Sequence, residues 1–325
     1  MAGSFTSAAT RTRAGRAFRA HRRAVPVHAR CRRRHSGHLS IEDHEMKFTL
    51  WRHVVSCVSL LASGPIQAAP AVPDVALWRL DCGELQMNDA SPLSDAGSYS
   101  GKSRRLSDGC YLIRHGKELL LWDAGLPATL LGTPIDAQPI SPTLAVDLPT
   151  QLARIGIRPN DIGRLAISHY HFDHVGQAAT FPHAMLLIGA KDWAALHSGT
   201  IPFADPHLLA PWFSGGGKVD LIEGDRDVFG DGSVVMLATP GHTPGESSLL
   251  VRLPKTGAVI LTGDVVHLAA QWPLSAVPIW NTERADSLAS MDRLQKLAAN
   301  FGATIIVQHD PADIGKLARF PAASR

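Results

Sequence analysis

Residues 168–174 read Ser-His-Tyr-His-Phe-Asp-His and follow directly on a run of apolar residues at 165–167. Three imidazoles and one carboxylate thus stand within six residues, at the end of a segment with the composition of a buried strand. Neutral imidazole nitrogen and carboxylate oxygen are ligands that Zn²⁺ accepts in an open catalytic site. Surface histidines of an ordinary loop are the alternative, but such a concentration beside an apolar strand is improbable by chance. The stretch therefore predicts a metal site that includes His169, His171, Asp173 and His174.

Three more candidate ligands each lie at the end of an apolar run or just after one. His242 follows the run at 234–238, within the turn Pro-Gly-His-Thr-Pro-Gly at 240–245, while Asp264 ends the segment 259–264 and His309 ends the segment 305–309. Singly, each has an ordinary interpretation as a turn residue or as a polar residue beside a helix. Ligands at the ends of different strands can meet at one rim of a layered sheet. We therefore expect these three to join the histidine cluster.

The pattern of apolar residues predicts a single layered α/β domain over residues 70–325. Apolar runs of strand length alternate with turn residues at 75–80, 110–114, 119–122, 165–167, 185–188, 219–222, 234–238, 248–253, 258–261 and 304–307. Helical periodicity is found at 147–155, 191–197 and 282–300. Helices thus fall between strands in both halves, which favours sheets inside and helices outside. The Pro- and Gly-rich stretch at 198–217 is expected to run over the surface as a long loop.

The N-terminal residues have a composition of their own. Residues 1–45 hold ten of the 32 Lys and Arg residues against three acids, without a periodic apolar face, so they are not expected to fold by themselves. A second methionine, Met46, opens a short basic start, an apolar run at 54–66 and small residues at 68–69. We expect residues 46–68 to be a cleaved secretory signal and residues 1–45 to be a disordered extension or a misassigned start. The alternatives are an organelle transit peptide at residues 1–40 and a nucleic-acid-binding arm.

Export changes the charge balance and the expected partners. The apolar run of about 13 residues is shorter than the roughly 20 that a spanning helix needs, so a periplasmic or secreted protein without stable membrane insertion is expected. Residues 69–325 keep 20 basic and 26 acidic side chains, so the net charge moves from +3 to about −6, which argues against a nucleic-acid partner. Of the four cysteines only Cys82 and Cys110 remain. They can pair in an oxidising compartment or stay as buried thiols.

On these residues the sequence resembles the metallo-β-lactamase superfamily, whose signature His-x-His-x-Asp-His is present at 169–174. Within it, the chain is most similar to the N-acyl-homoserine lactonase family. The resemblance extends from about Leu80 to Pro321 and includes Leu-Trp-Asp-Ala-Gly at 121–125, the turn around His242, Leu-Thr-Gly-Asp at 261–264 and Gln-His-Asp at 308–310. It implies the four-layer αββα sandwich of that superfamily.

The resemblance also implies a role for each site residue. One zinc ion is expected on His169, His171 and His242, and a second on Asp173, His174 and His309, with Asp264 bridging both and Asp123 orienting a ligand imidazole. The implied reaction is attack of a hydroxide shared by the two ions on the carbonyl of an N-acyl-homoserine lactone or related lactone. Asp173 is expected to pass a proton to the leaving oxygen, so Asp173 and Asp264 are the catalytic candidates. His267 either faces this site or packs beside it.

The sequence leaves the substrate itself open. None of the three tyrosines, Tyr99, Tyr111 and Tyr170, matches the tyrosine that assists the substrate carbonyl in well-known lactonases of this family. Five aromatic residues are expected either to line an apolar substrate pocket or to pack in the core, namely Trp193, Trp212, Phe213, Trp272 and Trp280. The alternative function is therefore hydrolysis of another ester class, namely an aryl ester, an organophosphate or a thioester. Metal binding without turnover is a more distant alternative. The partner is a small molecule in every enzymatic interpretation, and the sequence predicts no oligomeric state.

Overall fold

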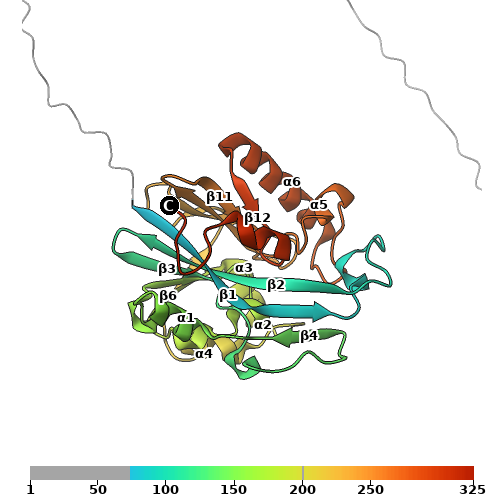
Figure 1. The fold of residues 1–325 in the computed structure, drawn as a ribbon, viewed down its shortest axis with the longest axis horizontal. Coiled ribbons are helices and arrows are strands. Elements are labelled where there is room, and N and C mark those ends of the chain that lie inside the picture. Colours follow the sequence, from blue (N-terminus) through green and yellow to red (C-terminus); the bar gives the residue numbers. More distant parts are fainter. Residues whose placement is uncertain (1–73, 200) are drawn as a thin grey trace, which may run out of the picture. The chain divides into compact units, whose positions relative to one another are not determined.

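Two β-sheets lie face to face in the computed structural model, which describes residues 74–199 and 201–325 (Figure 1). The expected extension at 1–45 and the expected signal at 46–68 lie outside the described residues. The first sheet has the strand order β4-β1-β2-β3-β5-β6-β7. Its strands are β1 (Val75–Met87), β2 (Arg104–His115), β3 (Glu118–Trp122), β4 (Ile140–Thr143), β5 (Arg164–Ala166), β6 (Met185–Gly189) and β7 (Val219–Ile222). It is antiparallel from β4 to β3 and parallel from β3 to β7.

The second sheet has the order β12-β11-β10-β9-β8. Its strands are β8 (Arg226–Asp227), β9 (Val234–Ala238), β10 (Ser247–Leu253), β11 (Gly257–Leu261) and β12 (Thr304–Ile306). Only β11 and β12 run parallel, and the helix between them makes the crossover that a parallel pair needs. The two strands therefore end at the same edge of the sheet.

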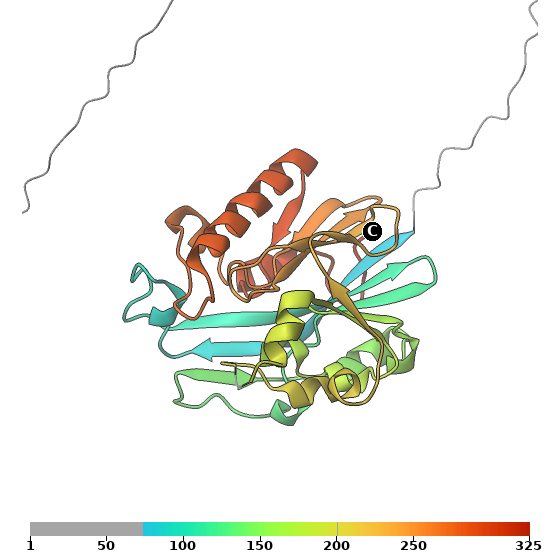
Figure 2. The same ribbon diagram turned by 180° about the vertical axis from the view of Figure 1, so that it is seen from behind.

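Helices cover the outer face of each sheet (Figures 1 and 2). The first sheet is covered by α1 (Leu148–Arg154), α2 (Phe172–Val175), α3 (Ala190–Leu196) and α4 (Ala210–Phe213), and the second by α5 (Gln271–Leu274) and α6 (Arg284–Phe301). Short 3₁₀ helices lie at Ser91–Leu93, Ala128–Leu130, Pro159–Asp161, Ala178–Thr180, Pro206–Leu209 and Pro311–Lys316. Within the described residues, none of the helices has both the length and the apolar character that crossing a membrane requires.

Strand alternation explains why both faces of the sheets are buried. On β3, Leu120 and Trp122 pack between the two sheets, whereas Leu121 packs against the helices of the first layer. On β11, Val259 and Leu261 face the first sheet, whereas Ile260 packs toward α6. Side chains alternate between the faces of a strand, so strands with continuous apolar sequence serve two apolar layers at once. Three apolar layers separate four structural layers, and the expected αββα sandwich is confirmed.

The structure adds elements that the sequence pattern does not predict. Strands β1 and β2 extend beyond the expected ranges 75–80 and 110–114, and the short helices α2 and α5 are additional. Strands β4 and β8 were absent from the sequence-based prediction, because Ile-Ser-Pro-Thr and Arg-Asp carry no apolar alternation. The expected surface loop at 198–217 contains two short helical segments instead, and it buries Leu209 and Trp212 in the core. The indole N–H of Trp212 donates to the carbonyl of Ala184 at 2.9 Å. This anchoring makes the segment a part of the domain rather than a loop on it.

A disulfide and a strained turn connect the first sheet to the edge where the histidines lie. Cys82 on β1 and Cys110 on β2 form a disulfide with the Cα atoms 5.7 Å apart. After β3 the chain turns sharply at Asp123 (φ 60°) and Gly125 (φ 60°). A Cβ on Gly125 would collide with the Cys82 side chain, so the turn packs directly on the disulfide. A non-glycine residue such as Asp123 rarely adopts a positive φ unless its surroundings hold it there.

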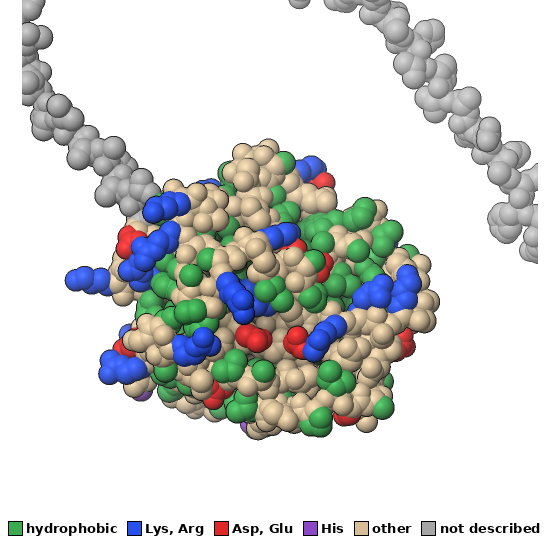
Figure 3. Space-filling view, viewed as in Figure 1, with side chains coloured by type: hydrophobic (Ala, Val, Ile, Leu, Met, Phe, Trp, Pro, Cys, Tyr) green, Lys and Arg blue, Asp and Glu red, His purple; other side chains and the backbone are tan. Residues whose placement is uncertain are grey.

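Basic and acidic side chains are interspersed on the molecular surface. On the face drawn in Figure 3, Lys and Arg side chains alternate with Asp and Glu and with apolar side chains. Pairs such as Arg158 with Asp161 and Arg226 with Asp220, both 2.8 Å apart, lie at the surface. Exposed pairs of this kind add little stability.

Candidate metal centre

The histidine cluster is positioned by the end of β5 and the start of α2. The strand β5 ends at Ala166, and residues 167–171 lead into α2 without a break. His169 and His174 are fully buried, whereas His171 and Asp173 are 8 % and 9 % exposed. Because α2 begins at Phe172, Asp173 and His174 lie on its first turn and turn back toward His169. A six-residue segment thus presents four ligand-type side chains to one point.

The remaining three candidates arrive from the second sheet. His242 lies in the turn between β9 and β10, Asp264 follows β11 and His309 follows β12. The His242 Nε2 atom lies 3.2 Å from His169 Nε2 and 3.0 Å from His171 Nδ1. The His309 Nε2 atom lies 3.2 Å from His174 Nε2 and 3.9 Å from the nearer carboxylate oxygen of Asp173. The seven predicted residues therefore form two neighbouring groups at one edge of the sandwich.

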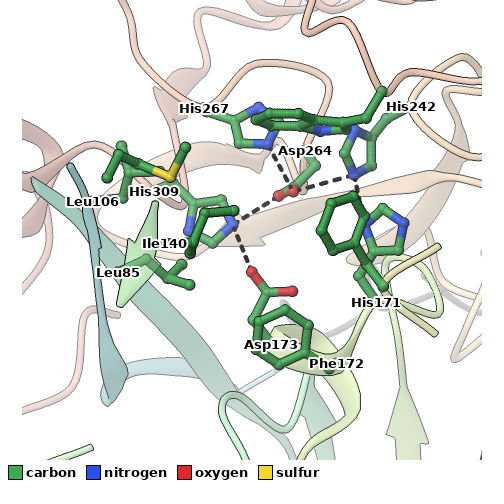
Figure 4. A pocket seen from close by; sticks show the side chains of 13 residues that line it. Leu85, Leu106, Ile140, His171, Phe172, Asp173, His242, Asp264, His267 and His309 are labelled. Atoms are coloured by element: carbon green, nitrogen blue, oxygen red, sulfur yellow. Dashed lines mark hydrogen bonds and ion pairs between the residues drawn. The ribbon is translucent and has the colours of Figure 1, made fainter. Parts of the chain in front are cut away.

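Asp264 lies between the two groups, as Figure 4 shows. Its Oδ1 lies 3.0 Å from His309 Nε2 and 3.2 Å from His174 Nε2, and its Oδ2 lies 3.3 Å from His242 Nε2. The carboxylate thus presents one oxygen to each group. This is the placement expected for a residue that bridges two ions.

The donor set fits a pair of zinc ions. Ligand atoms of His169, His171 and His242 lie within 4.8 Å of one another, and so do those of Asp173, His174 and His309. Each group offers imidazole nitrogens or a carboxylate oxygen, with no thiol, and Asp264 adds one carboxylate oxygen to each. Three protein ligands with room for another are typical of catalytic rather than structural zinc.

The second nitrogen of most of these imidazoles is held by a protein acceptor. His174 Nδ1 lies 3.0 Å from Asp123 Oδ2, His242 Nδ1 lies 2.9 Å from Asn281 Oδ1, and His309 Nδ1 lies 2.8 Å from the carbonyl oxygen of Ser107. An acceptor behind the ring selects the tautomer whose other nitrogen is free for a metal. Asp123 therefore lies where its carboxylate can accept a hydrogen bond from the His174 ring. The Ser168 N–H and the Gln308 amide also donate to Asp123, at 2.7 and 2.6 Å.

Glu246 stands behind His169, a role that the sequence did not reveal. Its Oε2 lies 3.2 Å from His169 Nδ1, and its Oε1 accepts from the Asp264 N–H at 2.8 Å. The side chain is 1 % exposed. Its position four residues after His242 carries no signal of this contact, because Glu246 lies directly before β10 and reaches His169 only through the packing of two segments that are far apart in the chain.

Burial and charge set the protonation of the cluster. Burial lowers the pKa of His169 and His171 well below the ordinary value, and that of His242 to about 3. Burial has the same tendency at His309, but the Asp264 carboxylate outweighs it and raises the pKa to about 9. Burial would raise the pKa of Asp264, yet the imidazoles of His309 and His174 hold it well below the usual range. His169, His171 and His242 are thus neutral beside an ionised Asp264, the forms that bind a metal, whereas His309 has to give up a proton when a metal binds.

A pocket opens directly onto the centre, and its outer wall is apolar. Its lining includes five of the expected ligands and also His267, and the rest is apolar, namely Leu85, Met87, Leu106, Ile140, Phe172, Phe203 and Trp280 (Figure 4). Of the five aromatic candidates from the sequence, Trp280 lines this pocket. The other four, Trp193, Trp212, Phe213 and Trp272, pack against the core layers beneath the helices. Phe203, which the sequence did not single out, lies edge-on to His171 with ring centroids 5.5 Å apart.

Comparison with known proteins gives a consistent result. Residues 109–309 match the family model of the metallo-beta-lactamase superfamily. N-acyl homoserine lactonase AttM of Azorhizobium caulinodans is 30% identical over 177 residues, which cover 50% of this chain and 63% of that protein. This chain therefore spans less than two thirds of the length of that relative.

Solved structures show the same fold. A quorum-quenching N-acyl homoserine lactone hydrolase superposes with a TM-score of 0.66 at 25% identity, covering 76% of this chain and 97% of that one. AidC, a dizinc quorum-quenching lactonase solved with a product, N-hexanoyl-L-homoserine, superposes with a TM-score of 0.57 at 16% identity, covering 77% and 90%.

Proposed function

The chain belongs to the metallo-beta-lactamase superfamily, and we propose that it is a zinc-dependent hydrolase that opens the lactone ring of N-acyl-homoserine lactones. The observation that carries the proposal is the arrangement of seven ligand-type side chains in two groups around Asp264, at the floor of a pocket with an apolar wall. The lactonase named among the relatives and the two lactonases among the solved structures support the substrate class.

Each ligand-type residue takes a defined part in this proposal. His169, His171 and His242 would hold one zinc ion, Asp173, His174 and His309 would hold the other, and Asp264 would contribute to both. Bound zinc supplies an activated water near neutral pH and a Lewis acid for the substrate carbonyl. The protein fixes the spacing of the two groups through Asp264 and through the hydrogen bonds behind the imidazoles. Asp123 serves as the positioning residue for His174.

Asp173 is suited to deliver a proton to the leaving oxygen. It lines the pocket, and it lies on the first turn of α2, beside the apolar wall at Phe172. Opening a lactone converts the ring oxygen into an alkoxide, which needs one proton to leave as an alcohol. A carboxyl group at the pocket floor can carry that proton from the attacking water to the ring oxygen.

The apolar wall is suited to hold an acyl chain. Leu85 and Leu106 lie on the neighbouring strands β1 and β2, Ile140 begins β4, and Trp280 closes the other side. Burying an aliphatic chain against this surface gains about 0.8 kcal/mol for each methylene group. The chain length of the best substrate is thereby expected to depend on this wall. An aryl ester or aryl phosphotriester would use the same surface, which makes these compounds the main competitors.

A hydrolysis panel tests the proposal. Residues 69–325, loaded with zinc, are assayed on N-acyl-homoserine lactones of several chain lengths, an aryl phosphotriester, a thioester and a cephalosporin. We expect ring opening of the lactones with the highest kcat/KM. Clear turnover of another compound without lactone opening would refute the substrate class, and full activity after metal removal would refute the metal centre.

We also propose that the protein acts in the periplasm or outside the cell. The disulfide between Cys82 and Cys110 supports this location, since structural disulfides persist in oxidising compartments. The secretory pattern that starts at Met46 supports it independently. Expression from Met46, followed by cell fractionation and N-terminal sequencing, is expected to give a periplasmic protein that begins near residue 69. A cytoplasmic product with an intact residue 46–68 segment would contradict the proposal.

A further inference from the structure

His267 is the polar residue of the pocket that the proposed function does not use. The thirteen side chains that line the pocket comprise seven apolar residues, five expected zinc ligands and His267. It is 5 % exposed and reaches the pocket from the loop between β11 and α5, three residues after Asp264. Apart from the indole N–H of Trp280, it is the one hydrogen-bonding side chain among the described lining residues that is not an expected ligand. His267 also belongs to a group with His242 and Asp264 whose atoms lie close enough to hold a metal, so its use as a ligand is an outcome that the experiment below tests.

Its surroundings hold the imidazole in one place. The carboxamide oxygen of Gln271 accepts from the backbone N–H groups of His267 at 2.6 Å and Leu268 at 2.9 Å, and the Gln271 side-chain amide donates to the carbonyl of Leu93 at 2.8 Å. The ring stacks on His309 with centroids 5.5 Å apart and meets the edge of Trp280 at 5.8 Å. A donor that is fixed before the substrate arrives costs no reorganisation during the reaction.

The two ring nitrogens differ in their partners. His267 Nε2 lies 3.2 Å from Asp264 Oδ2 and points toward the centre of the pocket floor (Figure 4). Nδ1 is buried and has no hydrogen-bond partner among the described residues. A neutral imidazole carries one N–H, and a buried donor without a partner costs more than a buried lone pair without one. The proton therefore belongs on Nε2, where it faces the carboxylate and the pocket.

We propose that His267 is a catalytic residue that donates the Nε2–H hydrogen bond to the carbonyl oxygen of the substrate as that oxygen gains negative charge. The inference rests on the proposed function, because it needs a carbonyl substrate above the centre. Once Asp264 serves as a ligand, its charge is shared with the cations and its hold on the imidazole weakens. The N–H can then turn to the developing oxyanion, while no covalent bond to His267 forms or breaks. Substrates that bind with their carbonyl oxygen next to His267 Nε2 are therefore expected to react faster.

The experiment compares His267→Phe, His267→Gln and the matched control His183→Phe, in which an exposed histidine outside the pocket is replaced. Zinc content, melting temperature, kcat and KM are measured on the panel compound that the native protein hydrolyses best. We expect His267→Phe to keep two zinc ions and to lose about 100-fold in kcat, the usual loss for one oxyanion donor. His267→Gln is expected to recover part of that loss through its side-chain N–H, and the control is expected to match the native protein.

Three outcomes overturn the inference. A His267→Phe protein with kcat within about threefold of the native value shows that the donor is not used, and loss of a zinc ion shows that His267 is a ligand. Calorimetric affinity for an alkyl phosphonate, a tetrahedral anion that mimics the oxyanion, gives a readout without turnover and is expected to fall in parallel with kcat. An unchanged phosphonate affinity also overturns it. If the native protein hydrolyses another panel ester but no lactone, the proposed function fails, and the variants measured on that ester still decide the role of His267.

Discussion

Replacement of Glu246 by Gln tests whether a single buried carboxylate aligns ligands from both sheets. Oε1 accepts from the Asp264 N–H at 2.8 Å, and Oε2 lies 3.2 Å from His169 Nδ1. Both neighbours present an N–H when zinc is bound, so both require an acceptor. A glutamine has one oxygen and one amide group. Either the Asp264 N–H or the His169 N–H then faces another donor in a site without water access.

The magnitude follows from this mismatch. A buried donor without an acceptor costs about 1–3 kcal/mol, and about 1.4 kcal/mol corresponds to a factor of ten in an equilibrium constant. The expected result is therefore a loss of about 10- to 100-fold in zinc affinity, the range typical of residues that support a metal ligand. Burial raises the pKa of Glu246 well above its usual range. Its ionised form thus depends on nearby cations, so the loss is expected mainly in the zinc-bound state.

Zinc affinity is measured by competition with a chelating dye, and thermal unfolding is followed with and without zinc. Glu223→Gln is the matched control, because Glu223 is exposed on the turn after β7. We expect the Glu246→Gln protein to lose the gain in melting temperature that zinc gives, while the control keeps it. A Glu246→Gln protein with zinc affinity within about threefold of the native value would refute the reasoning.

Four further predictions concern the centre, its metal, the scaffold and the pocket wall. Asp264→Asn is expected to lower zinc content below two ions per chain and to abolish hydrolysis; two ions with full turnover would contradict the bridging role. Chelation should lower the melting temperature, since a ligand at 100 times its Kd contributes about 2.7 kcal/mol; an unchanged melting curve speaks against a resident metal. The double change Cys82→Ser and Cys110→Ser removes the disulfide, which joins residues 28 positions apart. It should lower the free energy of unfolding by about 3–4 kcal/mol, measured by urea titration; a loss below about 1 kcal/mol contradicts this. Trp280→Ala should raise KM more for long-chain than for short-chain lactones; an equal rise for both would place the acyl chain elsewhere.

The sequence predicted the metal ligands, but it left open the disulfide. Four of the ligand-type residues lie within six positions of the sequence, where local backbone geometry alone keeps side chains close together. They are His169, His171, Asp173 and His174. His242, Asp264 and His309 were predicted from the rule that strand ends meet at one rim, and the structure brings them to the cluster. The expectation that the aromatic residues divide between pocket and core is met with Trp280 in the pocket. The Cys82–Cys110 pairing, left open by the sequence, required the register of β1 and β2.

By itself, the pattern of residues determined a layered α/β domain and the ligand types, because strand periodicity and short-range spacing are properties of the local backbone. The four-layer sandwich and the division of the ligands into two groups were implied by the resemblance to the metallo-β-lactamase superfamily. Only the tertiary structure decided which polar residues stand behind and above the ligands. Glu246 reaches His169 across 77 residues of chain, and Asn281 reaches His242 across 39. His267 faces the pocket because Gln271 and Trp280 hold its loop there. Such contacts depend on how distant segments pack, and packing depends on the combined shape of many side chains rather than on any spacing along the chain.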